Sequence, residues 1–384
     1  MTSTLAGNKR IFISDIHMGD QRSMTGHFPY GWLRENIRPL NDFLTGLSDQ
    51  IEAEDVGQVV ILGDLFDQWV IPTDLDPLPG LKDICDNPAN EGMIHNLQKL
   101  ANSRKLTYVP GNHDMSPSQK DIPAVKEFVE GTFPGINFKS TGFYTEGNLV
   151  AEHGNMYCLF NAPDTWTSPD SFLPLGYFIS RVAAYKMEHT GQSENYFHNF
   201  WNKIKDFIRE YERNPNLIYD FFLDVAHDAG LEDSDEIKMK NITGFPPVIT
   251  ISDVANRYIQ LKRDWDNNHD KIGSGTAFLG DSPFGLSRAA FTVYLQTGTD
   301  INIVIFGHTH SWENEDVYPS LDENDQENGL PHPSKAIYAN SGTWIDHKPC
   351  TYIETQADAQ TQLHYVRVKE YPGNKLLQER FVNL

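Results

Sequence analysis

The sequence predicts an α/β fold built on a largely parallel β-sheet, and three observations support this prediction. Five short runs are rich in β-branched residues and show no polar alternation, which is typical of strands buried on both faces. Segments with helical periodicity separate the first three runs, and each run ends in glycine or polar residues. The five runs are Ile11–Ser14, Val59–Leu62, Leu106–Val109, Leu149–Ala151 and Ile301–Phe306.

Two amphipathic segments predict the helices that join the first three strands. Apolar residues recur at helical spacing from Ile37 to Ile51 and again from Met93 to Ala101. Strand, helix, strand, helix, strand is the βαβ pattern of a parallel sheet, because parallel neighbours need a crossover connection. Further strands are expected at Ile337–Asn340, Thr351–Glu354 and Leu363–Val368.

The middle of the chain differs from its flanks, because residues 157–296 are mostly helical in pattern and rich in aromatic residues. Amphipathic stripes run along Phe197–Tyr211, Ile218–Val225 and Val254–Trp265, and we expect them to form core contacts. The sequence therefore predicts a helical insertion over 157–296. It would interrupt a core domain made of residues 1–156 and 297–384.

The charge balance bears on the partners of the protein. The 384 residues carry a formal net charge of −22, and no basic patch is visible. Because proteins that grip nucleic acids use clusters of Lys and Arg, we do not expect a nucleic-acid partner. The densest charge run, Trp312–Gly329, is acidic and is expected to be a solvated loop.

Cysteine usage and hydropathy indicate the compartment. Cys85, Cys158 and Cys350 lie far apart, which argues against a disulfide framework and against a zinc site with thiolate ligands. The first residues lack the apolar core of a signal peptide, and no stretch reaches the roughly 18 apolar residues of a membrane span. We therefore expect a cytoplasmic protein. Peripheral contact with a membrane and the oligomeric state stay open.

Each of the five predicted strands is followed directly by a short polar motif. In an open α/β sheet the binding site lies beyond the carboxyl ends of the strands, so these motifs are expected to converge. Gly63, Gly111 and Gly307 precede polar residues where the chain must turn sharply, which glycine does without steric cost. The motifs are Asp15-Ile16-His17, Gly63-Asp64-Leu65-Phe66-Asp67, Pro110-Gly111-Asn112-His113-Asp114, Glu152-His153-Gly154 and Gly307-His308-Thr309-His310.

The converging motifs would bring together several carboxylates, one asparagine and up to five histidines. So many ionisable groups in one place are costly without an opposing charge, and divalent metal ions supply that charge. Imidazole and carboxylate together suit Zn, Fe, Mn or similar ions. The lack of cysteine in the motifs argues against a closed structural zinc site.

This set of motifs resembles that of the calcineurin-like metallophosphoesterase superfamily, over roughly residues 9–155 and 300–345. The resemblance implies a four-layer α/β/β/α sandwich and a centre of two divalent metal ions, with Mn expected and Fe or Zn as alternatives. It also implies that Asp64 bridges the two ions. The first ion would be bound by Asp15, His17, Asp64 and His310, and the second by Asp64, Asn112, His153 and His308.

In the same family His113 is not a metal ligand but faces the substrate, where it protonates or stabilises the leaving group. Two ions about 4 Å apart clamp the attacking and leaving oxygens of an in-line displacement and acidify the shared water to a hydroxide nucleophile. We therefore expect metal-dependent hydrolysis of a phosphodiester or pyrophosphate bond, with His113 as general acid. Asp67 and Asp114 are expected to orient histidine ligands, with a loop or cap role as the alternative for both.

Several segments are similar to the UDP-2,3-diacylglucosamine pyrophosphohydrolases, a branch in which a helical insertion forms a lid that binds acyl chains. That branch carries Arg at the position of His113 and Asp at the position of Asn155, so a different small or lipid-linked substrate is expected. The similar segments are Ile13–Gly19, Gly63–Trp69, His153–Asn155 and Asn340–Trp344.

Other functions and contacts stay open at this point. A phosphomonoesterase or protein phosphatase is the alternative among enzymes, and a non-catalytic scaffold is the alternative from another class. Arg181 is a candidate contact for a substrate phosphate, against a surface or salt-bridging role. Aromatic residues near the motifs either line a pocket or pack the insertion onto the core. They are Trp69, Tyr157, Phe160, Trp166 and Phe172.

Overall fold

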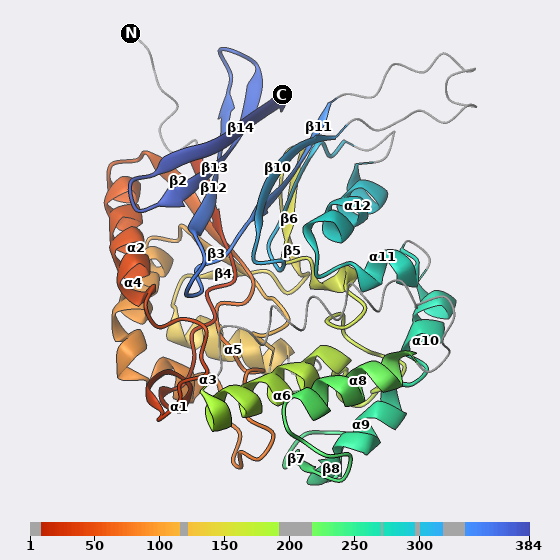
Figure 1. Cartoon of the computed structure of the whole chain (residues 1–384). Coiled ribbons are helices and arrows are strands. Elements are labelled where there is room, and N and C mark those ends of the chain that lie inside the picture. The colour runs from red at the N-terminus through yellow and green to blue at the C-terminus, as the bar shows by residue number, and fades with distance from the viewer. Residues whose placement is uncertain (1–8, 116–121, 192–216, 270–271, 296–299, 318–334) are drawn as a thin grey trace, which may run out of the picture.

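Two β-sheets face each other between layers of helices in the computed structural model, which describes residues 9–115, 122–191, 217–269, 272–295, 300–317 and 335–384 (Figure 1). The larger sheet has seven strands in the order β14-β13-β12-β1-β2-β3-β4. Strands β1 to β4 run parallel, and β12 pairs antiparallel with β1. The bounds are β1 (Lys9–Ile13), β2 (Val56–Leu62), β3 (Leu106–Val109), β4 (Asn137–Phe138), β12 (Cys350–Asp358), β13 (Leu363–Tyr371) and β14 (Lys375–Asn383).

The smaller sheet has five strands in the order β10-β11-β9-β6-β5. Its three central strands run parallel, and antiparallel strands form both edges. Each strand predicted from the sequence is present in one of the two sheets, with ends shifted by a few residues. The bounds are β5 (Phe143–Glu146), β6 (Leu149–Glu152), β9 (Ile303–Phe306), β10 (Trp312–Val317) and β11 (Ala336–Ser341).

Apolar side chains on both faces of the strands build the layers. In β1, Ile11 and Ile13 pack against the outer helices, whereas Phe12 points into the space between the sheets. In β9, Ile305 faces the other sheet and Phe306 packs against the helix α12 (Pro283–Tyr294). The α/β prediction is confirmed, because runs without polar alternation have a buried layer on each side. The outer helices beside the larger sheet are α2 (Ile37–Glu52), α4 (Glu91–Asn102) and α5 (Ile122–Thr132).

The start of the acidic run departs from the expected solvated loop. Residues Trp312–Val317 form β10, which pairs with β11 at the edge of the smaller sheet. Its acidic residues suit an edge position, because charged side chains there discourage pairing with other chains. The rest of the run, from residue 318 onward, lies outside the described residues.

The described part of the chain between β6 and β9 forms mostly helices. Several of them lie below the two sheets in Figure 1, and α12 lies beside the smaller sheet. Phe221, Val254 and Trp265 belong to a hydrophobic cluster that this segment largely builds for itself. Helix α12 is different, because Leu286 and Ala290 pack on the outer face of the smaller sheet. The division into core and insertion at 157 and 296 stays a prediction. The elements are α6 (Leu175–Thr190), α8 (Leu217–Asp228), β7 (Glu236–Lys238), β8 (Val248–Thr250), α9 (Ile251–Tyr258), α10 (Leu261–Asn268), α11 (Ser274–Phe278) and α12.

The predicted stripes of the segment have different outcomes. Ile218–Val225 lies in α8 with its apolar face buried, as expected. Val254–Trp265 is also buried, but it is divided between α9 and α10. Phe197–Tyr211 lies outside the described residues. Within the described part of the chain, every helix is too short or too polar to cross a membrane. Short helical turns complete the fold, at α1 (Gln21–Thr25), α3 (Leu81–Cys85), η1 (Pro88–Asn90) and η3 (Asn155–Tyr157).

Candidate metal centre

Five of the predicted ligand residues have backbone torsions that side chains other than glycine rarely adopt. Their φ values lie between 53° and 73°, in the left-handed region. Strain of this kind persists only where the surroundings hold it, and it concentrates at functional sites. Here hydrogen bonds between loops hold it, such as those from the amides of Ile16 and His17 to the Asp64 carbonyl, both 2.8 Å long. The strained residues are Asp15, His17, Asp64, His308 and His310.

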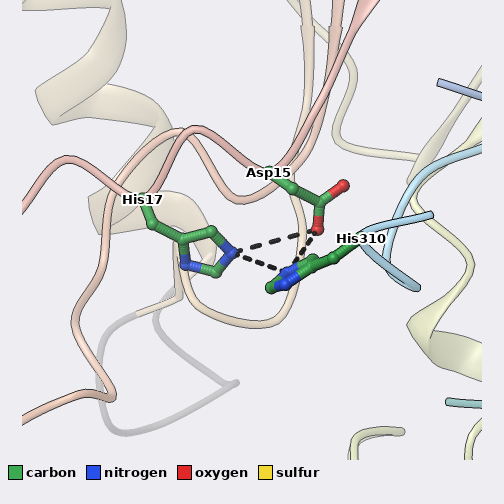
Figure 2. A group of neighbouring side chains, drawn as sticks. All are labelled: Asp15, His17 and His310. Carbon is green, nitrogen blue, oxygen red and sulfur yellow. Dashed lines mark hydrogen bonds and ion pairs between the residues drawn. The ribbon is translucent and has the colours of Figure 1, made fainter. Parts of the chain in front are cut away.

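The first group of donors joins the loops after β1 and β9 (Figure 2). His310 Nε2 lies 3.1 Å from Asp15 Oδ1 and 3.1 Å from His17 Nε2. Asp15 is fully buried, and its Oδ1 has no hydrogen-bond partner among the described residues. A buried carboxylate oxygen of this kind is costly unless a cation satisfies it. The group therefore fits a metal ion.

The second group of donors joins the loops after β2, β3, β6 and β9. His153 Nε2 lies 3.2 Å from Asp64 Oδ2 and 3.0 Å from Asn112 Oδ1. His308 Nδ1 lies 3.2 Å from the same His153 nitrogen. His153 Nδ1 donates to the Leu62 carbonyl, 2.8 Å away, which leaves the Nε2 lone pair directed at the other donors.

Asp64 lies between the two groups. Its Oδ2 atom is 3.6 Å from His17 Nε2 in the first group and 3.2 Å from His153 Nε2 in the second. Its other oxygen, Oδ1, accepts a hydrogen bond from the backbone amide of His113, 2.9 Å long. One carboxylate oxygen is therefore shared by both sets of donors.

Asp67 contacts two of the predicted histidines, as expected. Its Oδ1 lies 2.9 Å from His113 Nδ1, and its Oδ2 lies 3.4 Å from His17 Nδ1. The backbone amides of Trp69 and Val70 also donate to Oδ1 and fix the carboxylate. Asp67 therefore orients both rings so that each Nε2 atom points away from it.

Asp114 has other contacts than those expected from the sequence. Its carboxylate accepts hydrogen bonds from the backbone amides of Asp64, Phe66 and Gly111, at 2.6, 2.8 and 2.7 Å. Burial and the nearby charge of Asp64 raise the pKa of Asp114 to about 6. Of the two roles expected for Asp114, the orientation of a histidine is wrong and the loop role is found, because the carboxylate joins the loops after β2 and β3.

The electrostatics of the centre favour positive charge. Burial alone would lower the pKa of His17, but its contacts with Asp15 and Asp67 raise it to about 10. Burial also opposes protonation of His153, yet the Asp64 carboxylate raises its pKa to about 9. Buried carboxylates thus attract cations to this site, and nitrogen and oxygen donors together suit divalent transition metals.

Residues 9–312 match the sequence model of the family described as calcineurin-like phosphoesterase. The chain belongs to the calcineurin-like phosphoesterase family. Membership and the two His/Asp groups make the protein a metal-dependent phosphoester hydrolase, so its substrate is a phosphoester. No curated protein matches the chain.

Two residues that lie beside the proposed metal ligands of the phosphoesterase were not predicted from the sequence. Asp281, between α11 and α12, places its Oδ1 3.0 Å from His308 Nε2. The ring of Trp32 lies 4.4 Å from that of His17 and 5.4 Å from that of His113, measured between centroids. Neither residue belongs to a motif, so only the folded chain shows that it lies at the site.

Among the described residues, Arg181 of the phosphoesterase has neither of the two roles considered from the sequence, a contact with the substrate phosphate or a surface or salt-bridging position. Arg181 is fully buried, and its guanidinium donates to the carbonyls of Ile71, Pro72, Thr73 and Lys238. The arginine therefore joins α6 to the loop after β2 and to β7. Of the aromatic candidates, Trp69 and Phe160 are buried in the core cluster of the helical segment, so they pack the segment onto the core. Trp166 is partly exposed.

Proposed function

We propose that the phosphoesterase binds two divalent metal ions and hydrolyses a phosphodiester or pyrophosphate bond in a small or lipid-linked substrate. The observation that carries the proposal is the position of Asp64 Oδ2, within 3.6 Å of a nitrogen in each donor group. A carboxylate in this position can bridge two ions. The first ion would be held by Asp15, His17, Asp64 and His310, and the second by Asp64, Asn112, His153 and His308.

Bound divalent ions supply Lewis-acid activation of water and neutralise charge on the phosphoryl group. The bond that forms joins a water oxygen to phosphorus, and the bond that breaks joins phosphorus to the leaving oxygen. That oxygen requires a proton. His113 can provide it from Nε2, because Nδ1 is occupied by Asp67 at 2.9 Å. The Asp67 carboxylate would stabilise the charged imidazole before the transfer.

The preference for a diester or pyrophosphate over a monoester rests on the similarity of Gly63–Trp69 and His153–Asn155 to the UDP-2,3-diacylglucosamine pyrophosphohydrolases. The mostly helical segment over 157–296 supports the same proposal, because it would shape the substrate side of the site as a lid. Mn²⁺ is the expected metal, with Fe or Zn as the alternatives, since the proposed ligands combine histidines with carboxylates and one amide oxygen. Phosphomonoester hydrolysis is the rival function.

Two reporters with the same leaving group separate these functions. We expect Mn²⁺ to support faster hydrolysis of bis-p-nitrophenyl phosphate than of p-nitrophenyl phosphate, and EDTA to abolish both. Asp64→Asn should lose the activity. Asp55→Asn, which removes an exposed carboxylate paired with Lys9, should retain it. Faster hydrolysis of p-nitrophenyl phosphate would establish phosphomonoester hydrolysis as the function. If neither reporter is hydrolysed in the presence of metal, a non-catalytic protein is favoured.

A further inference from the structure

We propose that Asp281 is a positioning residue for His308 and that it joins the helical segment to the second group of metal donors. The inference rests on the proposed function. Asp281 Oδ1 lies 3.0 Å from His308 Nε2, and the other ring nitrogen, Nδ1, lies 3.2 Å from His153 Nε2. The two nitrogens of His308 thus face opposite partners, a carboxylate on one side and the metal donors on the other.

This arrangement selects one form of the imidazole ring. A neutral histidine carries its proton on one nitrogen and a lone pair on the other. The carboxylate of Asp281 favours the proton on Nε2, which leaves the lone pair of Nδ1 free to bind a metal ion. Carboxylates that contact metal-binding histidines in this way fix the ring and strengthen the ligand.

Asp281 is itself held in place from the start of the helical segment. Asn161 Nδ2 donates to Asp281 Oδ1 over 2.7 Å, so the carboxylate is shared between Asn161 and His308. The side chain of Asp281 is only 12% exposed. A carboxylate buried to this extent needs such partners, because leaving one unpaired is costly.

The backbone around Asp281 is equally fixed. The amide of Leu159 donates to the Ala277 carbonyl over 2.8 Å. A Cβ atom at Gly280 would lie 2.5 Å from the Tyr157 carbonyl oxygen, so only glycine permits this close approach. The chain that follows η3 and the chain that follows α11 are therefore in contact, and Asp281 in the second of them lies beside His308. Their packing sets the position of the carboxylate.

Metal titration of the full chain tests this inference without using turnover. Stripped protein is titrated with Mn²⁺ by calorimetry, with bound Mn²⁺ counted independently by electron paramagnetic resonance. We expect the wild type to bind two ions. Asp281→Ala should keep the first and bind the second about 10- to 100-fold more weakly. Asp281→Asn should restore most of the affinity, because its amide oxygen can occupy the same place beside Nε2.

Asp164→Ala is the matched control. Asp164 is a buried carboxylate of the same segment that caps the amides of Trp166 and Thr167 and is not among the groups of metal donors. The Asp164→Ala substitution should lower the stability of the protein and leave its affinities for both Mn²⁺ ions unchanged. Asn161→Ala removes the amide group that holds Asp281, and it should lower the affinity for the second Mn²⁺ ion several-fold. This variant replaces Asp281→Ala in the test if Asp281→Ala does not fold.

The outcomes separate the inference from the proposed function. If Asp281→Ala binds both ions as tightly as the wild type, the inference is wrong and the proposed function stands. An equal loss of affinity in Asp164→Ala would also overturn the inference, since the effect would then follow from general loosening. If the wild type binds no Mn²⁺, the proposed function itself fails.

Discussion

His113 shows at the scale of one residue how neighbours orient a ring for a proposed role. Asp67 contacts its Nδ1, and the ring of Trp69 lies 4.9 Å away, measured between centroids. The ring is therefore held with Nε2 directed away from Asp67, as the proposed general acid role requires. General acid catalysis contributes most when the leaving group is poor, because a good leaving group departs without a proton.

His113→Asn should therefore slow diphenyl phosphate hydrolysis by about 100-fold. Hydrolysis of bis-p-nitrophenyl phosphate should slow by much less, because nitrophenolate leaves readily. The two kcat values measured with Mn²⁺ present give the ratio, and bound Mn²⁺ should match the wild type since His113 is not a proposed ligand. An equal change for both substrates would exclude the general acid role.

Some residues of the site could be predicted from the sequence and others could not, for a physical reason. Asp15 and His308 directly follow buried strands, so the rule that strand ends converge was enough to predict them. Asp281 and Trp32 come from connecting segments, whose path depends on tertiary packing. Asp114 lies at the site as expected, but its hydrogen-bond partners are backbone amides and not a histidine ring. The sequence does not show which of these a carboxylate faces.

At the scale of the element, the buried Arg181 side chain bonds α6 to the loop after β2 and to β7. Arg181→Met should lower the free energy of unfolding by about 3 kcal/mol, because buried carbonyls, including that of Pro72, would lose a charged donor. Urea denaturation measures the loss. Arg257→Met is the control, since Arg257 contacts the Phe245 ring and an exposed carbonyl, and it should cost under about 1 kcal/mol. Equal losses would contradict the role of Arg181.

Elements were predictable where burial left a clear pattern. Strands such as β1 and β9 are buried on both faces and appear as unbroken apolar runs. The edge strand β10 does not, because one of its long sides has no partner strand in the described part of the chain and charged residues are tolerated there. Helix α12 has an apolar stripe like its neighbours, and a stripe does not show whether it packs on a sheet or on other helices.

At the scale of the whole molecule, the proposed metal ions would connect the two sheets. Asp15 and Asp64 follow strands of the seven-stranded sheet, whereas His153 and His308 follow strands of the five-stranded sheet. A ligand that binds only the folded state stabilises it by mass action, by about 2.7 kcal/mol at 100 times its Kd.

Metal removal should therefore lower the thermal stability of the whole chain. We expect Mn²⁺ at 100 times its Kd to raise the Tm by about 5 °C relative to protein in EDTA. Differential scanning calorimetry measures the difference. Asp64→Asn should lose most of the increase, and Asp55→Asn should retain it. A Tm independent of Mn²⁺ would argue against ligands shared between the sheets.

The position of β1 also determines when the larger sheet can be completed during synthesis. Lys9–Ile13 pairs with β2 on one side and with β12 on the other, where Phe12 faces Ile353. On the ribosome, the second side of this strand stays without its partner until Cys350–Asp358 has been made. Unpaired apolar strands in partly folded chains are prone to aggregate, and pairing over such sequence distances is slow. Strand β1 is thus translated well before β12 can enclose it, and its apolar side chains are open to aggregation throughout that interval.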